Sequence, residues 1–251
     1  MVGTHIDITR QKETEQQLKE LIETKDKLFS IIAYDLRGPI GNFIPIINIL
    51  TSGEDLDEDT KNKFLEELKS ASRSTFNLLE NLLNWSRSQT NKIKITPQNF
   101  EINSLINDNV ELLRANANQK GISIGVTAEE NIMVYADMDS INLVIRNLLT
   151  NALKFTPTNG TIQIAATDKG TMIEVAISDT GVGIDKKIAD RLFLPNSFYS
   201  TRGTNNEKGA GIGLILCKDF VEKNGGNIGV ESILCQGSKF FFTIPKGRLV
   251  Y

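Results

Sequence analysis

The sequence predicts two folded parts of different class, an α-helical hairpin followed by an α/β domain. In roughly the first third of the chain, apolar residues recur at spacings of three and four, which is typical of amphipathic helices. Beyond residue 97, short strand-like runs alternate with helical ones. A chain of 251 residues with 40% apolar content is long enough and apolar enough to give both parts a core.

The first part is expected to contain two long helices. One apolar stripe runs from about Gln11 to Leu50, and a second runs from Phe64 to Gln89. Between them, "TSGEDLDEDT" supplies Gly53 to end the first helix and Asp57 or Asp59 to cap the second. A hairpin with one apolar face on each helix cannot cover its own seam. We therefore expect a homodimer in which two hairpins form an antiparallel four-helix bundle.

The second part is expected to be an α/β domain over residues 97–246. Its helical patterns lie at about 102–119, 138–155 and 211–223. The segment "LPNSFYSTRGTNNEK", residues 194–208, is too polar and too rich in turn formers for either element, so we interpret it as a mobile lid. The strands are expected in "ISIGVTA", "IMVYA", "GTIQIAATD", "TMIEVAISD", "NIGVES" and "SKFFFTIP".

Composition excludes several classes of protein. The net charge is −3 and no basic stripe stands out, which argues against nucleic acid as a partner. The longest apolar runs are shorter than the ~20 residues that a membrane span needs, so this fragment is not expected to contact a membrane. His5 is the only histidine, which disfavours zinc and haem. Two cysteines outside a C-x-x-C motif fit a reducing cytoplasm.

Polar residues with possible phosphate chemistry follow one helix face in "RNLLTNALKFTP". Asn147 and Asn151 are four residues apart, and Lys154 follows within one turn. Two amides and an ammonium on one face suit a hydrated Mg²⁺ and its attached phosphates. The alternative is an ordinary solvated face of an amphipathic helix.

In "SDTGVGI", a strand ends at Asp179 and meets a turn containing Gly181 and Gly183. A carboxylate at that position suits an exocyclic amine, and glycines let the backbone approach a flat ligand. The alternative is an ordinary tight turn.

A second glycine-rich stretch, "KGAGIGL", places Gly209, Gly211 and Gly213 before a helix whose N-terminus favours an anion. The alternative here is a plain glycine-rich helix start. The stretch departs from G-x-G-x-x-G and is not a Walker A loop.

The three clusters, in this order, resemble the Bergerat-type ATP-binding domain of sensor histidine kinases, gyrase B, the MutL proteins and heat-shock chaperone ATPases. The resemblance implies ATP and Mg²⁺ as ligands. It implies that Asn151 binds Mg²⁺, that Asn147 and Lys154 face the phosphates, and that Asp179 binds the adenine amine. The remaining implied ATP-binding positions are Phe155, Gly181, Gly183, Gly209, Gly211, Gly213, Leu214 and, in the lid near the γ-phosphate, Arg202.

The stretch "FSIIAYDLRGPIG" begins at Phe29 and resembles the phosphoacceptor box of histidine kinases, F-x-x-I-A-H-[DE]-L-R-x-P. Every defined position matches except the histidine, which is Tyr34 here. The resemblance implies a two-component sensor kinase of the HisKA and HATPase_c type, with phosphorelay to a response regulator receiver domain. It divides the chain into a linker from a missing PAS-like sensor domain (1–20), a dimerisation and phosphotransfer hairpin (21–92) and a catalytic domain (97–246).

Tyr34 fits phosphoryl transfer badly. An imidazole has a pKa of about 6.5 and is available as a neutral nucleophile, whereas a phenol with a pKa of about 10 is almost entirely protonated at neutral pH. Asp35 would hold or accept the second proton of an imidazole. Arg37 either remains near the phosphoryl group, pairs with Asp35 or is simply solvated. We therefore expect autophosphorylation to be blocked.

Two explanations of the tyrosine stay open: replacement of the acceptor in an ordinary kinase, or a native pseudokinase that acts as an ATP-regulated interaction scaffold. The intact nucleotide motifs favour replacement. A gyrase-like or chaperone-like ATPase is disfavoured by the acceptor-like hairpin. Gly38 occupies the position where a threonine or asparagine commonly supports phosphatase activity, so we do not expect strong activity of that kind.

Overall fold

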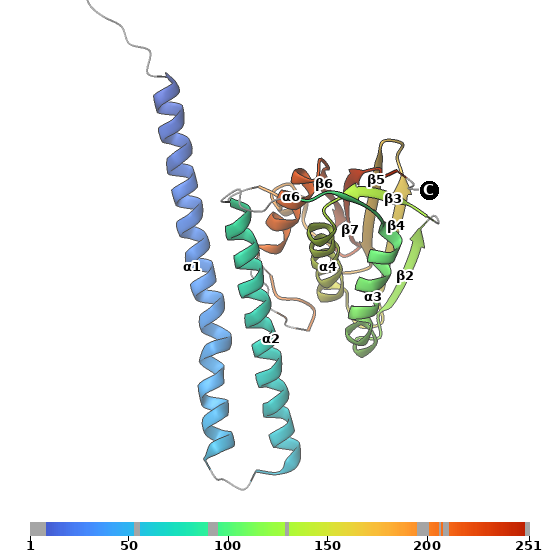
Figure 1. Ribbon diagram of the computed structural model, residues 1–251. Coiled ribbons are helices and arrows are strands. Elements are labelled where there is room, and N and C mark those ends of the chain that lie inside the picture. The colour runs from blue at the N-terminus through green and yellow to red at the C-terminus, as the bar shows by residue number, and fades with distance from the viewer. Residues whose placement is uncertain are drawn as a thin grey trace, which may run out of the picture. The chain divides into compact units, whose positions relative to one another are not determined.

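The computed structural model describes residues 9–52, 56–89, 95–128, 131–194, 201–205, 207 and 211–248. The chain divides into two compact units, Met1–Glu80 and Asn81–Tyr251. Figure 1 shows a pair of long helices in the first and an α/β arrangement in the second.

The first unit is built on two long antiparallel helices, α1 (Thr9–Thr51) and α2 (Glu58–Gln89), the latter extending past the unit boundary (Figure 1). Of the two expected caps for α2, Asp57 is used: its Oδ1 accepts from the Thr60 amide at 2.8 Å and its Oδ2 from the Thr60 hydroxyl at 2.8 Å. These bonds lower the pKa of the Asp57 carboxyl.

Among the described side chains of α1 and α2, some apolar residues are buried or half-buried and others are exposed. On α1, Ile46 is buried, whereas Ile44 is 64% exposed. On α2, Phe64 and Leu68 are half-buried, whereas Phe76 is 63% exposed. Apolar residues spaced three and four apart spread over a wide arc of the helix surface, so one side of the arc can be covered while the other is exposed. The side of the arc that includes Ile44 and Phe76 is exposed in the single chain.

The second unit contains a five-stranded sheet in the order β2-β4-β5-β7-β6. The β2–β4 pair is parallel and the remaining pairs are antiparallel. Alternating burial along β4 and β7 shows that one face of the sheet carries the core. The strands are β2 (Ser123–Ala128), β4 (Thr161–Asp168), β5 (Met172–Asp179), β6 (Ile228–Ile233) and β7 (Gly237–Pro245).

Three helices form a layer against this sheet, namely α3 (Ile102–Gln119), α4 (Met138–Phe155) and α6 (Gly213–Lys223) (Figure 1). The central helix, α4, packs against both others and against β5. Its apolar residues are spaced as an amphipathic helix requires, and Ile141, Leu148 and five further side chains of this stripe are buried. The result is the two-layer α/β sandwich that the sequence predicts.

Two small elements were not expected from the sequence. Strand β1 (Gln98–Glu101) pairs antiparallel with β3 (Met133–Ala136) in a separate two-stranded sheet, and α5 (Lys186–Ala189) is a single helical turn. Both segments, "QNFE" and "KKIA", are short and contain too few apolar residues to show a periodicity, unlike the apolar "MVYA" of β3. Among the described residues, no helix is long and apolar enough to cross a membrane.

Candidate functional site

Strand β5 ends at Asp179, a residue that is only 9% exposed. Its Oδ1 accepts hydrogen bonds from the backbone amides of Gly181 at 2.8 Å and Ser238 at 3.3 Å. Burial raises the pKa of this carboxyl, although the two amide bonds act in the opposite direction. No residue in the described parts of the chain donates a hydrogen bond to Oδ2. This oxygen also remains accessible to solvent. Asp179 therefore offers one oriented oxygen to an external donor.

The turn after Asp179 requires glycine twice, for different reasons. An ideal Cβ on Gly181 would lie 2.5 Å from both Asp179 Oδ1 and the Phe155 carbonyl oxygen. Gly183 has φ +65°, and a Cβ there would overlap the carbonyl group of Ile233. The loop therefore runs tightly between α4 and the β6–β7 turn, as close backbone approach requires.

Asn147 and Asn151 lie four residues apart on α4, and both are half-buried. Within the described part of the chain, no hydrogen bond occupies either side-chain amide. Asn147 Oδ1 would lie 3.1 Å from an ideal Cβ on Gly213, so α4 and the start of α6 approach closely at that point. The amide oxygens fit a hard cation such as Mg²⁺, which prefers oxygen ligands.

The start of α6 carries no side-chain cap. Gly211 has the left-handed conformation with φ +68°, which favours glycine, and Gly213 and Leu214 form the first turn. The first amides of a helix lack intrahelical partners, and an anion satisfies them. Gly209, the first predicted glycine of this stretch, lies outside the described residues.

The C-terminal end of α4 joins these features. The Phe155 carbonyl oxygen accepts from the Val182 amide at 3.2 Å, next to the glycines that follow Asp179. Lys154 lies over the Phe155 ring, with its Nζ 4.7 Å from the centroid, and donates to the Thr201 carbonyl oxygen at 2.9 Å. One helix thus contacts the carboxylate turn, the start of α6 and the segment beginning at Thr201.

The family model described as histidine kinase-, DNA gyrase B- and HSP90-like ATPase matches residues 136–248. These residues hold all the predicted nucleotide positions. The catalytic domain of the histidine kinase ThkA is 30% identical, and the match covers 60% of this chain and 96% of that domain with a TM-score of 0.54. The chain belongs to the histidine kinases.

Curated histidine kinases match this chain over most of its length. The adaptive-response sensory kinase SasA of Synechococcus sp. (strain JA-3-3Ab) is 30% identical over 237 residues, which are 93% of this chain. The autoinducer 2 sensor kinase/phosphatase LuxQ of Vibrio vulnificus is 25% identical over 253 residues. This histidine kinase chain spans 62% of the length of that SasA and 29% of that LuxQ.

The helical hairpin also has a counterpart among solved histidine kinases. ThkA in complex with the response regulator protein TrrA matches 97% of this chain and 68% of that one, with a TM-score of 0.69 and 22% identity. At that identity the match shows the fold alone. It nevertheless extends beyond the α/β sandwich.

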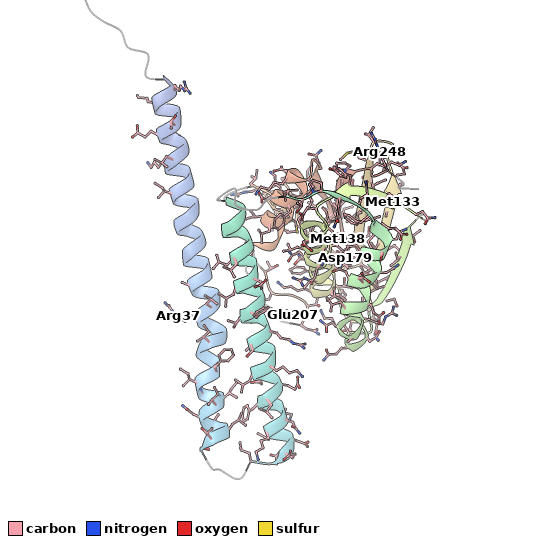
Figure 2. The ribbon with its side chains drawn as sticks, viewed as in Figure 1. Arg37, Met133, Met138, Asp179, Glu207 and Arg248 are labelled. Carbon is pink, nitrogen blue, oxygen red and sulfur yellow. The ribbon has the colours of Figure 1, made fainter. Side chains whose placement is uncertain are left out.

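The predicted acceptor residues lie on α1 of this histidine kinase. Tyr34 and Asp35 are within the helical backbone, and their side chains are outside the described part of the structure. Arg37 is exposed and extends from the side of α1 away from α2 (Figure 2). Arg202, in the segment predicted to be a lid, is also exposed. The expected mobility of residues 194–208 stays a prediction, because residues 195–200, 206 and 208 lie outside the described set.

Sequence reasoning missed Lys120, which is 8% exposed. It lies at the C-terminal cap of α3, and its ammonium pairs with Glu207 at 2.8 Å. The available signal was a lysine placed directly before "GISI", where an apolar strand begins. A charge next to a buried strand is rarely enclosed unless it has a partner.

Asp137 was also missed. Its Oδ1 accepts from the Ser140 amide at 2.9 Å and caps α4, and its Oδ2 accepts from the Thr96 amide at 2.9 Å. Burial alone would raise the pKa of this carboxyl, but the hydrogen bonds from Thr96 and Ser140 outweigh it and lower the pKa. An aspartate before an apolar periodic run was the available sign of a cap.

Proposed function

We propose that the α/β unit binds Mg-ATP and that the chain is the kinase core of a two-component sensor. Its family reaction is autophosphorylation from ATP followed by relay to a response regulator. The observation that carries the nucleotide site is the half-satisfied carboxylate of Asp179, which has one oxygen fixed by the amides of Gly181 and Ser238 and the other open. An oriented acceptor of this kind suits the exocyclic amine of adenine.

Different residues of the site bind different parts of the nucleotide. Asp179 Oδ2 accepts from the adenine amine, while the flanking glycines keep the backbone close to the flat base. The amide oxygen of Asn151 is a suitable ligand for Mg²⁺, which when bound neutralises charge on the phosphates, and Asn147 and Lys154 face those phosphates. The uncapped start of α6 supplies backbone donors to a phosphate. These groups hold and orient the triphosphate for transfer.

The acceptor position is where we expect the reaction to fail. Transfer to a histidine forms an N–P bond, breaks the bond to the ADP leaving group and releases the imidazole proton, which Asp35 is suited to hold. Tyr34 offers a phenol instead, with a pKa of about 10 and an oxygen further from the backbone. Because phosphoryl transfer rests on positioning, both changes oppose it.

Labelling with γ-phosphate-labelled ATP tests this proposal. Unaltered protein is expected to gain no label that survives base and is lost in acid, which is the signature of a phosphoramidate. Tyr34→His is expected to gain such label, and Tyr34→Phe serves as the matched control without a nucleophile. Acid-labile label on the unaltered chain would contradict the block. Absence of label on Tyr34→His would favour the pseudokinase scaffold.

A non-catalytic scaffold is the second candidate, in which nucleotide sets the arrangement of the parts. Partner binding that ignores both nucleotide and Asn151→Ala would support a scaffold without nucleotide control. Steady ATP turnover without any protein label would instead favour a gyrase-like or chaperone-like ATPase.

We also propose that the chain is a homodimer and that its hairpin forms half of a four-helix bundle. The support comes from the outward apolar faces, where Ile44, Ile47, Phe76 and Leu79 are between 42% and 64% exposed. A second copy would cover both faces at once. In this arrangement, residues 21–92 are the dimerisation and phosphotransfer hairpin, and residues 97–246 are the catalytic domain of a cytoplasmic core.

A further inference from the structure

Lys120 lies outside the predicted nucleotide motifs and joins three parts of the α/β unit. Its Nζ donates to the Leu153 carbonyl oxygen at 2.8 Å and to the Thr204 hydroxyl at 2.9 Å, and it lies 2.8 Å from Glu207 Oε1. An ammonium has three protons, and these three oxygens satisfy them. The C-terminal end of α3 is thereby tied to the end of α4 and to residues 201–205 and 207, which we call the anchored segment.

Glu207 closes the anchored segment as well as binding Lys120. Its carbonyl oxygen accepts from the Gly203 amide at 2.8 Å, and its Oε2 accepts from the Asn205 amide at 2.8 Å. Burial would raise the pKa of the Glu207 carboxyl, but the hydrogen bond from Lys120 and the amide bonds outweigh it and lower the pKa. The carboxylate form is therefore the one that holds the turn.

The anchored segment is also bonded directly to α4. The Lys154 carbonyl oxygen accepts from the Thr204 amide at 2.9 Å, and Lys154 Nζ donates to the Thr201 carbonyl oxygen at 2.9 Å. A Cβ on Gly203 would overlap the Lys154 side chain, so the packing there leaves no space. Both chain neighbours of Arg202 are thus fixed on the helix that carries Asn147 and Asn151.

Lys120 contacts the end of α4 and both Thr204 and Glu207 of the anchored segment. The last carbonyl groups of a helix lack intrahelical partners, and a cation at that end satisfies them and the helix dipole. Removing the ammonium would take from the Leu153 carbonyl oxygen and the half-buried Glu207 carboxylate the cation that both now contact. Lys120 therefore helps to hold the anchored segment in this conformation, together with the bonds that join Thr204 and Thr201 to the end of α4.

We propose that Lys120 is a positioning residue that sets Arg202 toward the terminal phosphate of the bound nucleoside triphosphate. The inference rests on the proposed ATP site and deepens it. Lys120 itself touches no nucleotide in this arrangement, because its three protons are already used. Its effect is to favour the triphosphate over the diphosphate, since only the triphosphate presents a γ-phosphate to Arg202.

The test compares the affinities of Lys120→Met and the unaltered chain for ATP and for ADP in Mg²⁺, by calorimetry. Loss of one charge-assisted phosphate contact should lower the ATP-to-ADP affinity ratio about tenfold, with ADP affinity changed by less than about threefold. A purely structural role would lower the affinities for ATP and ADP by the same factor. An ATP-to-ADP affinity ratio that does not change, with or without such a parallel loss, would overturn the proposal.

Lys169→Met provides the matched control, because Lys169 pairs with Glu174 at 3.9 Å on the β4–β5 hairpin and is exposed. It should leave the ratio unaltered. If Lys120→Met does not fold, Lys120→Met with Glu207→Gln removes the unpaired carboxylate, and the same ratio is read from the double variant.

Amide hydrogen exchange without nucleotide gives an independent reading. Residues 203–205 should exchange faster in Lys120→Met, while the core of α4 keeps its protection. Unchanged exchange rates at residues 203–205 would be enough to refute the claim that Lys120 holds the anchored segment. If the unaltered chain binds no ATP, the proposed function fails, and the role of Lys120 toward the phosphate fails with it.

Discussion

The backbone amide of Gly181 lies 2.8 Å from Asp179 Oδ1, and an ideal Cβ on the same glycine would lie 2.5 Å from that oxygen. One residue thus both fixes the carboxylate and leaves no room for a side chain beside it. The remaining oxygen of Asp179 is held open by this contact, which makes the pair the most informative target for substitution.

Asp179→Asn should weaken ATP binding by about 10- to 100-fold, because a hydrogen bond to a charged acceptor is worth ~1.5–3 kcal/mol. The fold should be retained, since the amide oxygen of asparagine can still accept from Gly181 and Ser238. Calorimetric titration with ATP measures the change, and Asp190→Asn, at an exposed position, is the control. Equal ATP affinities for Asp179→Asn and the unaltered chain would contradict the assignment of the adenine site.

The raised pKa of Asp179 makes a pH-dependent prediction. A carboxyl whose folded pKa is raised contributes stability below its unfolded pKa and loses that contribution as the pH rises through the folded pKa. At pH 7 the buried Asp179 carboxylate is charged and destabilises the folded state, and Asp179→Asn removes that charge. The variant should therefore melt at a higher temperature than the unaltered chain at pH 7. The gap between the two melting temperatures should become smaller as the pH is lowered toward the ordinary pKa range of aspartate. Calorimetric melting of both proteins across that pH range measures this gap. A gap that grows on acidification would show that the folded state lowers the pKa of Asp179 instead of raising it.

Gly181→Ala should destabilise the α/β unit by about 1–3 kcal/mol, the usual cost of forcing a methyl group into a filled space. The new Cβ would meet both Asp179 Oδ1 and the Phe155 carbonyl oxygen. Gly41→Ala is the contrasting variant, because no atom lies within 4 Å of its ideal Cβ and alanine favours a helix. Denaturant unfolding compares the two. A Gly181→Ala protein as stable as the unaltered chain would refute the close approach.

Asn151→Ala should lower ATP affinity about tenfold or more when Mg²⁺ is present and should change it little when Mg²⁺ is chelated, because the amide oxygen is proposed to act on the metal. Thr150→Ala, at an exposed position on the same helix, is the control. Titrations with and without chelator give the two affinities. Equal losses in both conditions would place the role of Asn151 elsewhere than at the metal.

Charges on the outward apolar faces should dissociate the proposed dimer. Ile44→Glu and Phe76→Glu place carboxylates where the side chains are 64% and 63% exposed in the single chain. Light scattering should then report a mass near 27.9 kDa for each variant and twice that for the unaltered protein. Asn62→Glu, an exposed polar position on α2, should leave the dimer intact. A dimer that survives both apolar substitutions would exclude this interface.

Much of the fold could be predicted because long elements repeat their pattern several times. The expected ranges 102–119 and 138–155 coincide with α3 and α4, and the helix expected from 211 begins at Gly213. The elements β1 and α5 could not be anticipated, because their four residues contain too few apolar side chains to show a period, whereas the equally short β3 is apolar throughout. The sequence likewise could not decide between Asp57 and Asp59 as the cap of α2, because both lie close to the start of the helix. The bond from the Thr60 amide shows that Asp57 is the cap.

The sequence by itself determined which side chains are available for chemistry and in what order along the chain they occur. It determined the amide pair on α4, the aspartate at the end of β5, the glycines beside them and the tyrosine within an acceptor-like box. These follow from residue type and short spacing alone. The tertiary structure decided that Asp179 keeps one oxygen open, that Asn147 faces Gly213, and that Lys120 is buried against Glu207. Lys120 and Glu207 are far apart in sequence, and only the packing of α3, α4 and the anchored segment brings such distant charges within hydrogen-bonding distance and buries the ammonium.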